Sequence, residues 1–500
     1  MEIKLFNTMG RQKQVFEPII PGEVKLYACG PTVYDYAHIG HFFAYVFVDT
    51  LVRMLKYNGL KVTHVMNITD VGHLTDDADE GEDKIERKAE TEKKSVWEIS
   101  EYYTKDFFDA MEKLNVEKPD IVCKATDHIE DMINLVKKIE ENGYTYKTSD
   151  GIYFDTSKLQ DYGKLAGLNI EGLKEGARVE KNPEKKNHTD FALWKFSPKD
   201  KKRQMEWKSP FGKGFPGWHI ECSAMSIKHL GESFDIHGGG ADLLFPHHEN
   251  EIAQSEAFTG RPFARYWVHN GFITIDKEKM SKSLGNFFTI KEVLDKFDPE
   301  VVRFFLLSTH YRSPVEFSDE QLREAESSID RYYSTIVRIN DFFEKEDSGK
   351  EEFSNAGEIF EGLLLSFQEK FKEAMDDDFN TALALGHIFE LIREANRFLD
   401  NKPSGSKDRE LLLKTKELLR ETGIILNIFG RTPYEWYLSL MKIRKIGLSE
   451  KDIPEKIRER QAARQRKDWH TADAIRKELE EKGIILEDKK DRTDWKVKVG

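Results

Sequence analysis

The chain has 500 residues, which is too many for one ordinary hydrophobic core, so we expect two to four domains. It is 39% hydrophobic and 33% charged, a composition that excludes a disordered or membrane-embedded protein. No apolar run approaches the roughly 18 residues that a membrane span needs, and the N-terminus lacks the order of a signal peptide. Only three cysteines occur, which argues against a disulfide framework, so we expect a cytoplasmic protein.

The charge is unevenly distributed along the chain. The net charge is −13, and this overall value argues against a nucleic-acid partner. Residues 441–500, however, hold 18 Lys and Arg against 13 Asp and Glu, a local charge of +5 that leaves −18 on the rest. A basic tail on an acidic chain suits a local nucleic-acid footprint, and a solvated helical face explains it equally well.

The first half of the chain alternates short apolar strands with helical stretches. "VKLYAC" (24–29) is typical of a buried strand, and "FFAYVFVDTLVRMLKYNG" (42–59) of a helix that ends at Gly59. The alternating, β-branched "KVTHVMNIT" (61–69) predicts the next strand. This βαβ unit predicts a parallel sheet that binds ligands at the carboxyl ends of its strands.

Further along, longer helical patterns dominate. We expect helix over 95–143, a strand over 151–157, and a helical bundle from 318 to about 430 that is interrupted by loops at 345–356 and 401–408. The last 60 residues predict one helix over 455–482, which stops at Gly483, and then the short strand "IILED".

The stretch "KLYACGPTVYDYAHIGH" (25–41) places one cysteine and two histidines within 13 positions, which raises the possibility of a metal site. Its second part follows a strand and opens a helix, where backbone N–H groups and the positive helix end favour phosphate. His38 and His41, with Gly40 between them, can donate hydrogen bonds to phosphate oxygens as charge develops. Taken alone, the two histidines could equally decorate a turn.

A second phosphate-binding candidate is "DKEKMSKSLGN" (276–286). Lys279, Lys282 and two serines surround Met280, just after the strand-like "GFITI". Flexible lysines near a glycine suit a mobile loop that closes over a triphosphate. By itself the loop could be an ordinary lysine- and serine-rich turn.

Together, HIGH (38–41) and KMSKS (279–283) resemble the signatures of the class I aminoacyl-tRNA synthetases. "CGPTVYD", "NITD", "GWHIECSAM", "FDIHGGGADLLFPHHENEIAQS", "KMSKSLGNF", "MDDDFNTA" and the tail "RKDWHTADAIRKEL" look like the cysteinyl-tRNA synthetase family, over essentially the whole chain. The resemblance implies an α/β fold: a Rossmann-type parallel-sheet catalytic domain with an insertion, then an all-α helical bundle and a small C-terminal anticodon-binding domain. The implied domains are 1–120 and 211–260 for the two catalytic halves, 121–210 for the insertion, 261–317 for the KMSKS region, 318–440 for the bundle and 441–500 for the anticodon-binding domain.

The resemblance also implies one zinc ion per chain. The matching positions are Cys29, Cys222, His247 and Glu251, and two thiolates, an imidazole and a carboxylate are ordinary zinc ligands. His247 and Glu251 are four apart, so one helix face can present both. As a local motif the set is poor, because 193 residues separate the cysteines, and two buried core cysteines remain the alternative. We expect His248 to point elsewhere, toward the groups that surround the ligands, and Cys123 to be structural.

Other family positions carry over one by one. Gly30, Thr69, Trp218 and Asp242 match residues that line the cysteine pocket, although Trp218 could equally be a core aromatic. Gly238 and Gly239 match a glycine run that lies against adenosine, and ATP is also expected to contact His38, Gly40, His41 and Lys282. The chain departs from the family at Phe42-Phe43 and in the long acidic segment after NITD.

The implied reaction has two steps. The carboxylate of L-cysteine attacks the α-phosphate of Mg²⁺-bound ATP, and tRNA(Cys) then receives the cysteinyl group; His38, His41, Lys279 and Lys282 would assist the first step. We expect a monomer with no membrane partner. Two alternatives remain: a ligase that gives activated cysteine to an aminosugar, against which residues 410–500 argue, and a non-catalytic tRNA-binding paralogue, against which the intact signatures argue.

Overall fold

The computed structural model describes residues 2–74, 82–167, 183–198, 203–280, 287–344, 355–403, 405–489 and 492–499. The chain forms two compact units. The N-terminal unit contains Met1–Ile290, Tyr311–Val315 and Asp376–Phe379; the C-terminal unit contains Lys291–His310, Glu316–Met375 and Asn380–Gly500. Among the described residues, no helix combines the length and apolar character needed to cross a bilayer.

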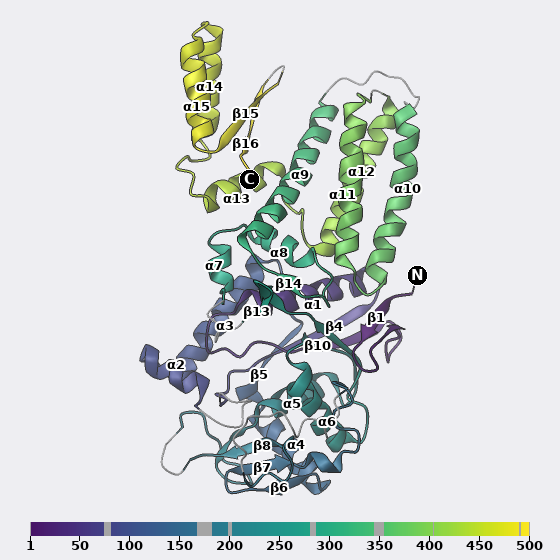
Figure 1. The fold of residues 1–500 in the computed structure, drawn as a ribbon, viewed down its shortest axis with the longest axis vertical. Helices are drawn as coiled ribbons and strands as arrows, with labels where there is room; N and C mark the ends of the chain where they lie inside the picture. The colour runs from purple at the N-terminus through teal and green to yellow at the C-terminus, as the bar shows by residue number, and fades with distance from the viewer. Residues whose placement is uncertain are drawn as a thin grey trace. The chain divides into compact units, whose positions relative to one another are not determined.

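The core of the N-terminal unit is a five-stranded parallel sheet in the order β11-β10-β3-β4-β5, of which β4, β5 and β10 are labelled in Figure 1. Its strands are β3 (Glu23–Ala28), β4 (Lys61–Ile68), β5 (Ile121–Lys124), β10 (Phe234–Gly240) and β11 (Ala264–Asn270). All four strand pairs are parallel. The strands predicted over 24–29 and 61–69 are therefore confirmed to within one residue, and so is the βαβ unit.

Helix α1 (Ile39–Tyr57) connects β3 to β4 and begins three residues before the predicted helix. His38 caps its N-terminus, a position that usually takes a smaller polar side chain, so the capping rules did not mark this residue, although the stretch that ends at His41 was expected to open a helix. Its Phe42 and Phe43 are buried, with 0% and 2% of their surfaces exposed. These two departures from the family pattern therefore lie in the core.

The stretch 95–143 is not one helical segment. It contains α3 (Val96–Lys113), the strand β5 and α4 (Ile129–Glu141), with α2 (Lys84–Glu92) ahead of them. β5 has only four residues, which is too short for a periodic pattern to indicate a strand. It forms a strand because it pairs with β4 at the edge of the sheet. This strand lies within the range 121–210 that was assigned to the insertion.

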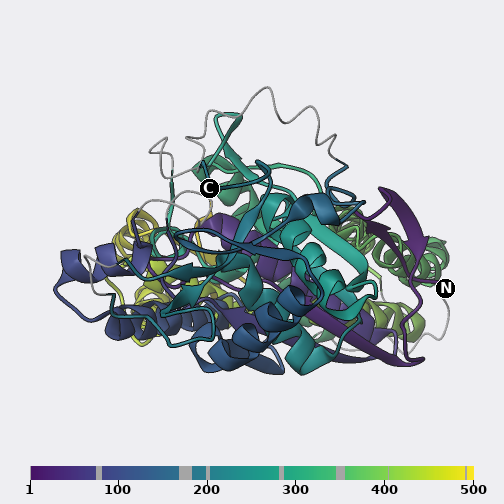
Figure 2. The same cartoon turned by 90° about the horizontal axis from the view of Figure 1, so that it is seen from below.

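Smaller sheets surround the parallel one. An antiparallel sheet contains β6 (Thr145–Lys147), β7 (Gly151–Phe154) and β8 (Phe191–Phe196) from the insertion range, and its fourth strand, β9 (Gly214–Pro216), lies just beyond that range. A hairpin of β1 (Lys4–Asn7) and β2 (Gln12–Val15), drawn in purple in Figure 2, carries the N-terminus. β12 (Ile273–Ile275), β13 (Glu278–Lys279) and β14 (Val315–Glu316) form a third sheet. The first strand that we expected in the insertion, over 151–157, corresponds to β7.

The C-terminal unit is mainly helical, as predicted. Its helices up to residue 443 are α7 (Ile290–Leu294), α8 (Pro299–Leu307), α9 (Asp319–Phe343), α10 (Asn355–Asp376), α11 (Thr381–Asp400), α12 (Ser406–Leu426) and α13 (Pro433–Ile443). Ser318 caps α9 through its hydroxyl, as its position predicts. Helices α9, α11 and α12 contact one another side by side and form the predicted bundle (Figure 1).

The single helix predicted over 455–482 is wrong. Two helices occupy this stretch, α14 (Asp452–Gln465) and α15 (Trp469–Glu481), and they pack against each other. Lys467 takes a positive φ of 61°, which a helix cannot include, and Asp468 caps the second helix through its side chain. The predicted strand "IILED" is β15 (Ile484–Asp488), which pairs with β16 (Thr493–Val497).

Candidate functional site

The predicted site residues of the N-terminal unit gather at the carboxyl edge of the parallel sheet. Cys29 directly follows β3, Thr69 directly follows β4, and Gly238 and Gly239 belong to the last residues of β10. Two helices bring the remaining groups: α5 (Trp218–Leu230) carries Cys222, and α6 (Glu249–Thr259) carries Glu251. The carboxyl edge of a parallel sheet is where open α/β folds bind ligands.

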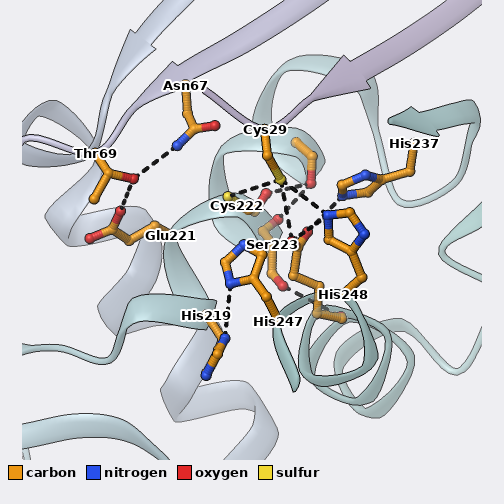
Figure 3. A network of polar contacts seen from close by, with 12 residues as sticks. Cys29, Asn67, Thr69, His219, Glu221, Cys222, Ser223, His237, His247 and His248 are labelled. Atoms are coloured by element: carbon orange, nitrogen blue, oxygen red, sulfur yellow. Dashed lines mark hydrogen bonds and ion pairs between the residues drawn. The ribbon is translucent and has the colours of Figure 1, made fainter. Parts of the chain in front are cut away.

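Cys29, Cys222, His247 and Glu251 converge, although 193 residues separate the two cysteines. One potential ligand atom from each lies within 4.8 Å of the others. The two Sγ atoms are 3.9 Å apart, and Oε1 of Glu251 lies 3.7 Å from Sγ of Cys29 and 3.0 Å from Nε2 of His247 (Figure 3). Two sulfurs, one imidazole nitrogen and one carboxylate oxygen form a donor set that suits tetrahedral zinc.

Neighbouring side chains hold these groups in orientation. Nδ1 of His219 lies 2.9 Å from Nδ1 of His247, which leaves Nε2 of His247 facing the sulfurs and Glu251. The Trp218 ring lies against the His247 ring, with centroids 4.4 Å apart. Outer contacts of this kind fix the tautomer and direction of an imidazole ligand. Trp218 is half-buried, so it is part of the wall of this group rather than a fully enclosed core aromatic.

A second, overlapping group could also hold a metal ion: Cys29, His237, His248 and Glu251. His248, which we expected to point away, has its Nε2 3.3 Å from Sγ of Cys29, and its Nδ1 is 2.8 Å from Nε2 of His269. His237 lies 2.8 Å from the other carboxylate oxygen of Glu251. The sequence placed His248 outside the four ligands, near them, but gave no sign that its Nε2 would approach Cys29 directly. A short π-helical turn (Leu244–His248) with an extended residue inside it, Phe245, precedes α6 and alters that geometry.

The electrostatics of the group follow from burial and mutual contact. Burial disfavours the charged form of Glu251, yet the imidazoles of His237 and His247 hold the pKa of this carboxyl down at about 2. The contact from Cys29 lowers the pKa of the Cys222 thiol, and burial raises the pKa of Cys29. A thiolate is the form that binds a metal, so one sulfur of the pair is already biased toward it.

His38 and His41 form a reciprocal cap at the start of α1. Nδ1 of His38 accepts from the backbone N–H of His41 at 3.2 Å, and Nδ1 of His41 accepts from the N–H of His38 at 3.4 Å. Their rings stack with centroids 3.6 Å apart. Since both Nδ1 atoms accept, the proton of each neutral ring is on Nε2, the nitrogen that can donate to a phosphate. A Cβ on Gly40 would lie 2.9 Å from Nδ1 of His38, so glycine makes room for the stack.

The two flanks of the KMSKS loop contact this helix start. The same Cβ position on Gly40 lies 3.3 Å from Cε of Met280, and the Phe287 ring meets the His38 ring edge-on at 5.1 Å. Phe288 accepts from the N–H of Ile39. HIGH and the ends of the KMSKS segment are thus neighbours. Lys282 lies outside the described residues, and Lys279 belongs to β13.

The predicted cysteine-pocket residues sit beside the metal-ligand group, except for one. Gly30 follows Cys29, and its N–H donates to Oδ1 of Asn67 at 2.8 Å. Thr69 is buried and donates its hydroxyl to Glu221 at 2.9 Å. Asp242 is exposed, just beyond β10.

The predicted adenosine-contacting glycines are both buried. A Cβ on Gly239 would lie 2.7 Å from Cε1 of His248, so the packing of that ring already requires a glycine here. A Cβ on Gly238 would make only ordinary contacts. Contact of either residue with adenosine stays a prediction.

The comparisons with known proteins first define the class. The family described as "tRNA synthetases class I (C) catalytic domain" matches residues 15–327. The DALR domain family matches 370–430, and the "Cysteinyl-tRNA ligase anticodon binding domain" matches 456–495. A solved methionyl-tRNA synthetase of Mycobacterium tuberculosis, 16% identical, aligns with a TM-score of 0.59 over 86% of this chain and 94% of its own, which supports the fold alone. The chain is thus a class I aminoacyl-tRNA synthetase.

The curated relatives then define the branch. "Cysteine--tRNA ligase" of Thermodesulfovibrio yellowstonii is 51% identical over 99% of this chain and 100% of its own length. The protein of the same name from Thermococcus onnurineus is 45% identical over 99% of each. The chain belongs to the cysteine--tRNA ligase family.

Proposed function

We propose that this enzyme activates L-cysteine with ATP to cysteinyl-adenylate and transfers the cysteinyl group to tRNA(Cys). The observation that carries the proposal is the convergence of two chemically different groups on one sheet edge. A buried cluster of sulfur, imidazole and carboxylate ligands begins at Cys29. Nine residues later, a helix start presents His38 and His41.

The activation step needs donors for developing phosphate charge rather than a protein nucleophile. The carboxylate oxygen of cysteine forms a bond to the α-phosphorus of Mg²⁺-bound ATP, and the bond from that phosphorus to pyrophosphate breaks. The Nε2–H groups of His38 and His41, together with the N-terminus of α1, suit stabilisation of this charge. Lys282, with Lys279 and Gly40, is assigned to the same phosphates from the signatures.

Selection of cysteine is assigned to the buried ligand group. Cys29, Cys222, His247 and Glu251 would hold one zinc ion, which when bound lowers the pKa of a substrate thiol and prefers sulfur to hydroxyl oxygen. Pocket shape alone discriminates small side chains by only about 1–3 kcal/mol. Gly30, Thr69 and Trp218 would line the cysteine, and Asp242 would approach it from the exposed loop after β10.

The acceptor is assigned to tRNA, because residues 456–495 match a tRNA anticodon-binding family. Purified chain should charge tRNA with labelled cysteine and should not label an aminosugar. It should also catalyse cysteine-dependent exchange between ATP and pyrophosphate. Labelling of the aminosugar without tRNA charging would overturn the acceptor, and an absence of exchange would overturn the enzyme activity. We further propose that the enzyme works as a monomer in the cytoplasm.

A further inference from the structure

A second polar network lies next to the ligand group, and the function proposed above does not use all of it. Thr69 is 2% exposed and Glu221 has no exposed surface. The Thr69 hydroxyl donates to Oε2 of Glu221 at 2.9 Å, and it accepts from Nδ2 of Asn67 at 3.0 Å (Figure 3). Oδ1 of Asn67 accepts from the N–H of Gly30 at 2.8 Å.

Two residues of this network are the chain neighbours of the two cysteines of the ligand group. Glu221 directly precedes Cys222 on α5, and Gly30 directly follows Cys29. The Thr69 backbone is also fixed, because its N–H donates to Pro31 at 3.0 Å and its carbonyl accepts from Val33 at 3.1 Å. The Thr69 hydroxyl is therefore held in place relative to the position where a substrate thiol would bind.

The directions of the hydrogens from Gly30 through Asn67 to Thr69 follow from which groups can donate. The Gly30 backbone N–H can only donate, so the Asn67 amide must present its oxygen to Gly30 and its NH₂ to Thr69. The Glu221 carboxylate accepts on both oxygens, from Thr69 and from Nε2 of His73 at 2.5 Å. A hydroxyl has one hydrogen and two lone pairs. The Thr69 hydroxyl donates its one hydrogen to Glu221 and accepts from Asn67 on one lone pair. The second lone pair of the hydroxyl is left, so Thr69 can only accept from a further group.

We propose that Glu221 is a positioning residue that, with Asn67, turns the Thr69 hydroxyl into an acceptor for the α-ammonium group of the bound amino acid. The inference rests on the cysteine pocket of the proposed function and adds the substrate group that Thr69 reads. An α-carboxylate cannot donate to this lone pair, whereas an ammonium can. The carboxylate behind the hydroxyl also strengthens it as an acceptor for a cation. In cysteine the sulfur and the amine are on neighbouring carbons, so a thiol bound at the ligand group would bring the amine close to it.

The test uses two probes that each keep the thiol but only one other group of cysteine. Cysteamine keeps the amine and lacks the carboxylate; 3-mercaptopropionate keeps the carboxylate and lacks the amine. Each is measured as an inhibitor of cysteine-dependent pyrophosphate exchange by the full-length wild type and by Thr69→Val, Glu221→Gln, Glu221→Met and the Thr69→Val/Glu221→Gln double variant. Zinc content is measured for every protein, and Glu249→Gln is the control.

Glu249 is a matched control because it is also a buried helix carboxylate. It accepts from the backbone N–H groups of Gly163, Leu165 and Ala166 and is not part of the Thr69 network. Gln at 221 has one acceptor oxygen for two hydrogens and Met has none, so Glu221→Met should have the larger effect. Thr69→Val keeps the shape of Thr69 without the hydroxyl.

We expect Thr69→Val and both Glu221 variants to raise the inhibition constant of cysteamine and the KM for cysteine by about tenfold or more. The inhibition constant of 3-mercaptopropionate and the zinc content should both stay within about twofold of the wild-type values. The double variant should be no worse than the worse single variant, because Glu221 acts through Thr69. An equal rise for both probes, a multiplied effect in the double variant, or an unchanged cysteamine constant in Glu221→Met would each overturn the inference. If wild-type protein lacks zinc or exchange activity, the proposed function fails instead.

Discussion

At the scale of single residues, the main question concerns which side chains around Cys29 hold a metal ion. Cys29 and Glu251 belong to two overlapping groups, one completed by Cys222 and His247 and the other by His237 and His248. The first group has two sulfurs, and His247 presents its Nε2 while His219 holds its Nδ1. In the second, His237 contacts the far oxygen of Glu251, as an outer partner of a ligating carboxylate does. We therefore propose the first group as the one that would hold a metal ion.

Replacement of Cys222 tests this assignment. Cys222→Ser exchanges a thiolate ligand for a hydroxyl that zinc binds poorly, so zinc content should fall to a small fraction and cysteine-dependent exchange by about a hundredfold or more. ATP binding should change far less. Metal analysis and exchange kinetics provide the measurements. Cys123→Ser is the matched control, since Cys123 is also a buried cysteine and its sulfur donates to the Met66 carbonyl. Full zinc content in Cys222→Ser would contradict the assignment.

The lysine of the KMSKS loop should act on rate rather than on cysteine binding. Lys282→Ala removes a positive charge expected at the departing pyrophosphate, so the activation rate should fall by about a hundredfold with a nearly constant KM for cysteine. Pre-steady-state adenylate formation measures this rate. Lys277→Ala, outside the signature, should have little effect. A rise in the KM for cysteine with an unchanged rate would count against the role.

Only some of the contacts around Cys29 could be predicted from the sequence. The identity of the four ligand candidates came from motif resemblance, since no local spacing links Cys29 to Cys222. The contact between His248 and Cys29 depends on the π-helical turn before α6, and no sequence pattern indicated that turn.

At the scale of elements, the start of α1 combines a helix cap with the HIGH signature. The reciprocal contacts of His38 and His41 satisfy backbone groups that a helix start leaves open, and they also orient both rings. Under the proposed function, one structure would thus serve both stability and chemistry.

Gly40→Ala should separate these two effects from simple helix propensity. Alanine is the better helix former by about 1 kcal/mol, yet its Cβ would lie 2.9 Å from the His38 ring and disturb the stack. We expect the exchange rate to fall at least about tenfold while the protein remains folded. Gly362→Ala on α10, where a Cβ meets nothing within 4 Å, should retain activity and gain stability. Exchange kinetics and thermal unfolding, measured on both variants, distinguish a loss of activity from a change in stability. Full activity in Gly40→Ala would show that the stacked arrangement of the two histidine rings is not needed for activity.

Helices and strands were predicted correctly where a periodic pattern extends over many residues, as in the bundle helices. The predictions failed where a neighbouring element determines the conformation. β5 has four residues and exists because the edge of β4 offers a parallel partner. α14 and α15 read as one helix because their residues are equally good helix formers, and the break at Lys467 lets them pack on each other.

At the scale of the whole molecule, stability should depend on buried histidines as well as on apolar packing. His64 lies on β4 with 6% of its surface exposed, and burial lowers the pKa of His64 to about 4. In the unfolded chain His64 therefore becomes protonated near pH 6.5, whereas in the folded chain it becomes protonated only near pH 4. The stabilisation is complete above pH 6.5 and is lost as the pH falls toward 4, a change of about 3 kcal/mol.

His64→Gln should remove this part of the acid sensitivity. Denaturant unfolding at a series of pH values between 7 and 4 should give a shallower loss of free energy in the variant than in wild type. His387→Gln on α11, which is half-buried, should follow the wild-type curve. An unchanged slope in His64→Gln would show that other groups account for the acid sensitivity.

The sequence by itself determined the family, the βαβ order, the bundle and the HIGH and KMSKS signatures, because local periodicity and contiguous motifs are enough to recognise them. Only the tertiary structure decided which distant side chains meet. The parallel sheet brings the carboxyl ends of β3, β4 and β10 to one edge, and α5 and α6 close over it. Contacts such as those of Cys29 with Cys222 and of Thr69 with Glu221 are consequences of that topology, since strand order, and not spacing along the chain, sets the distance between the residues.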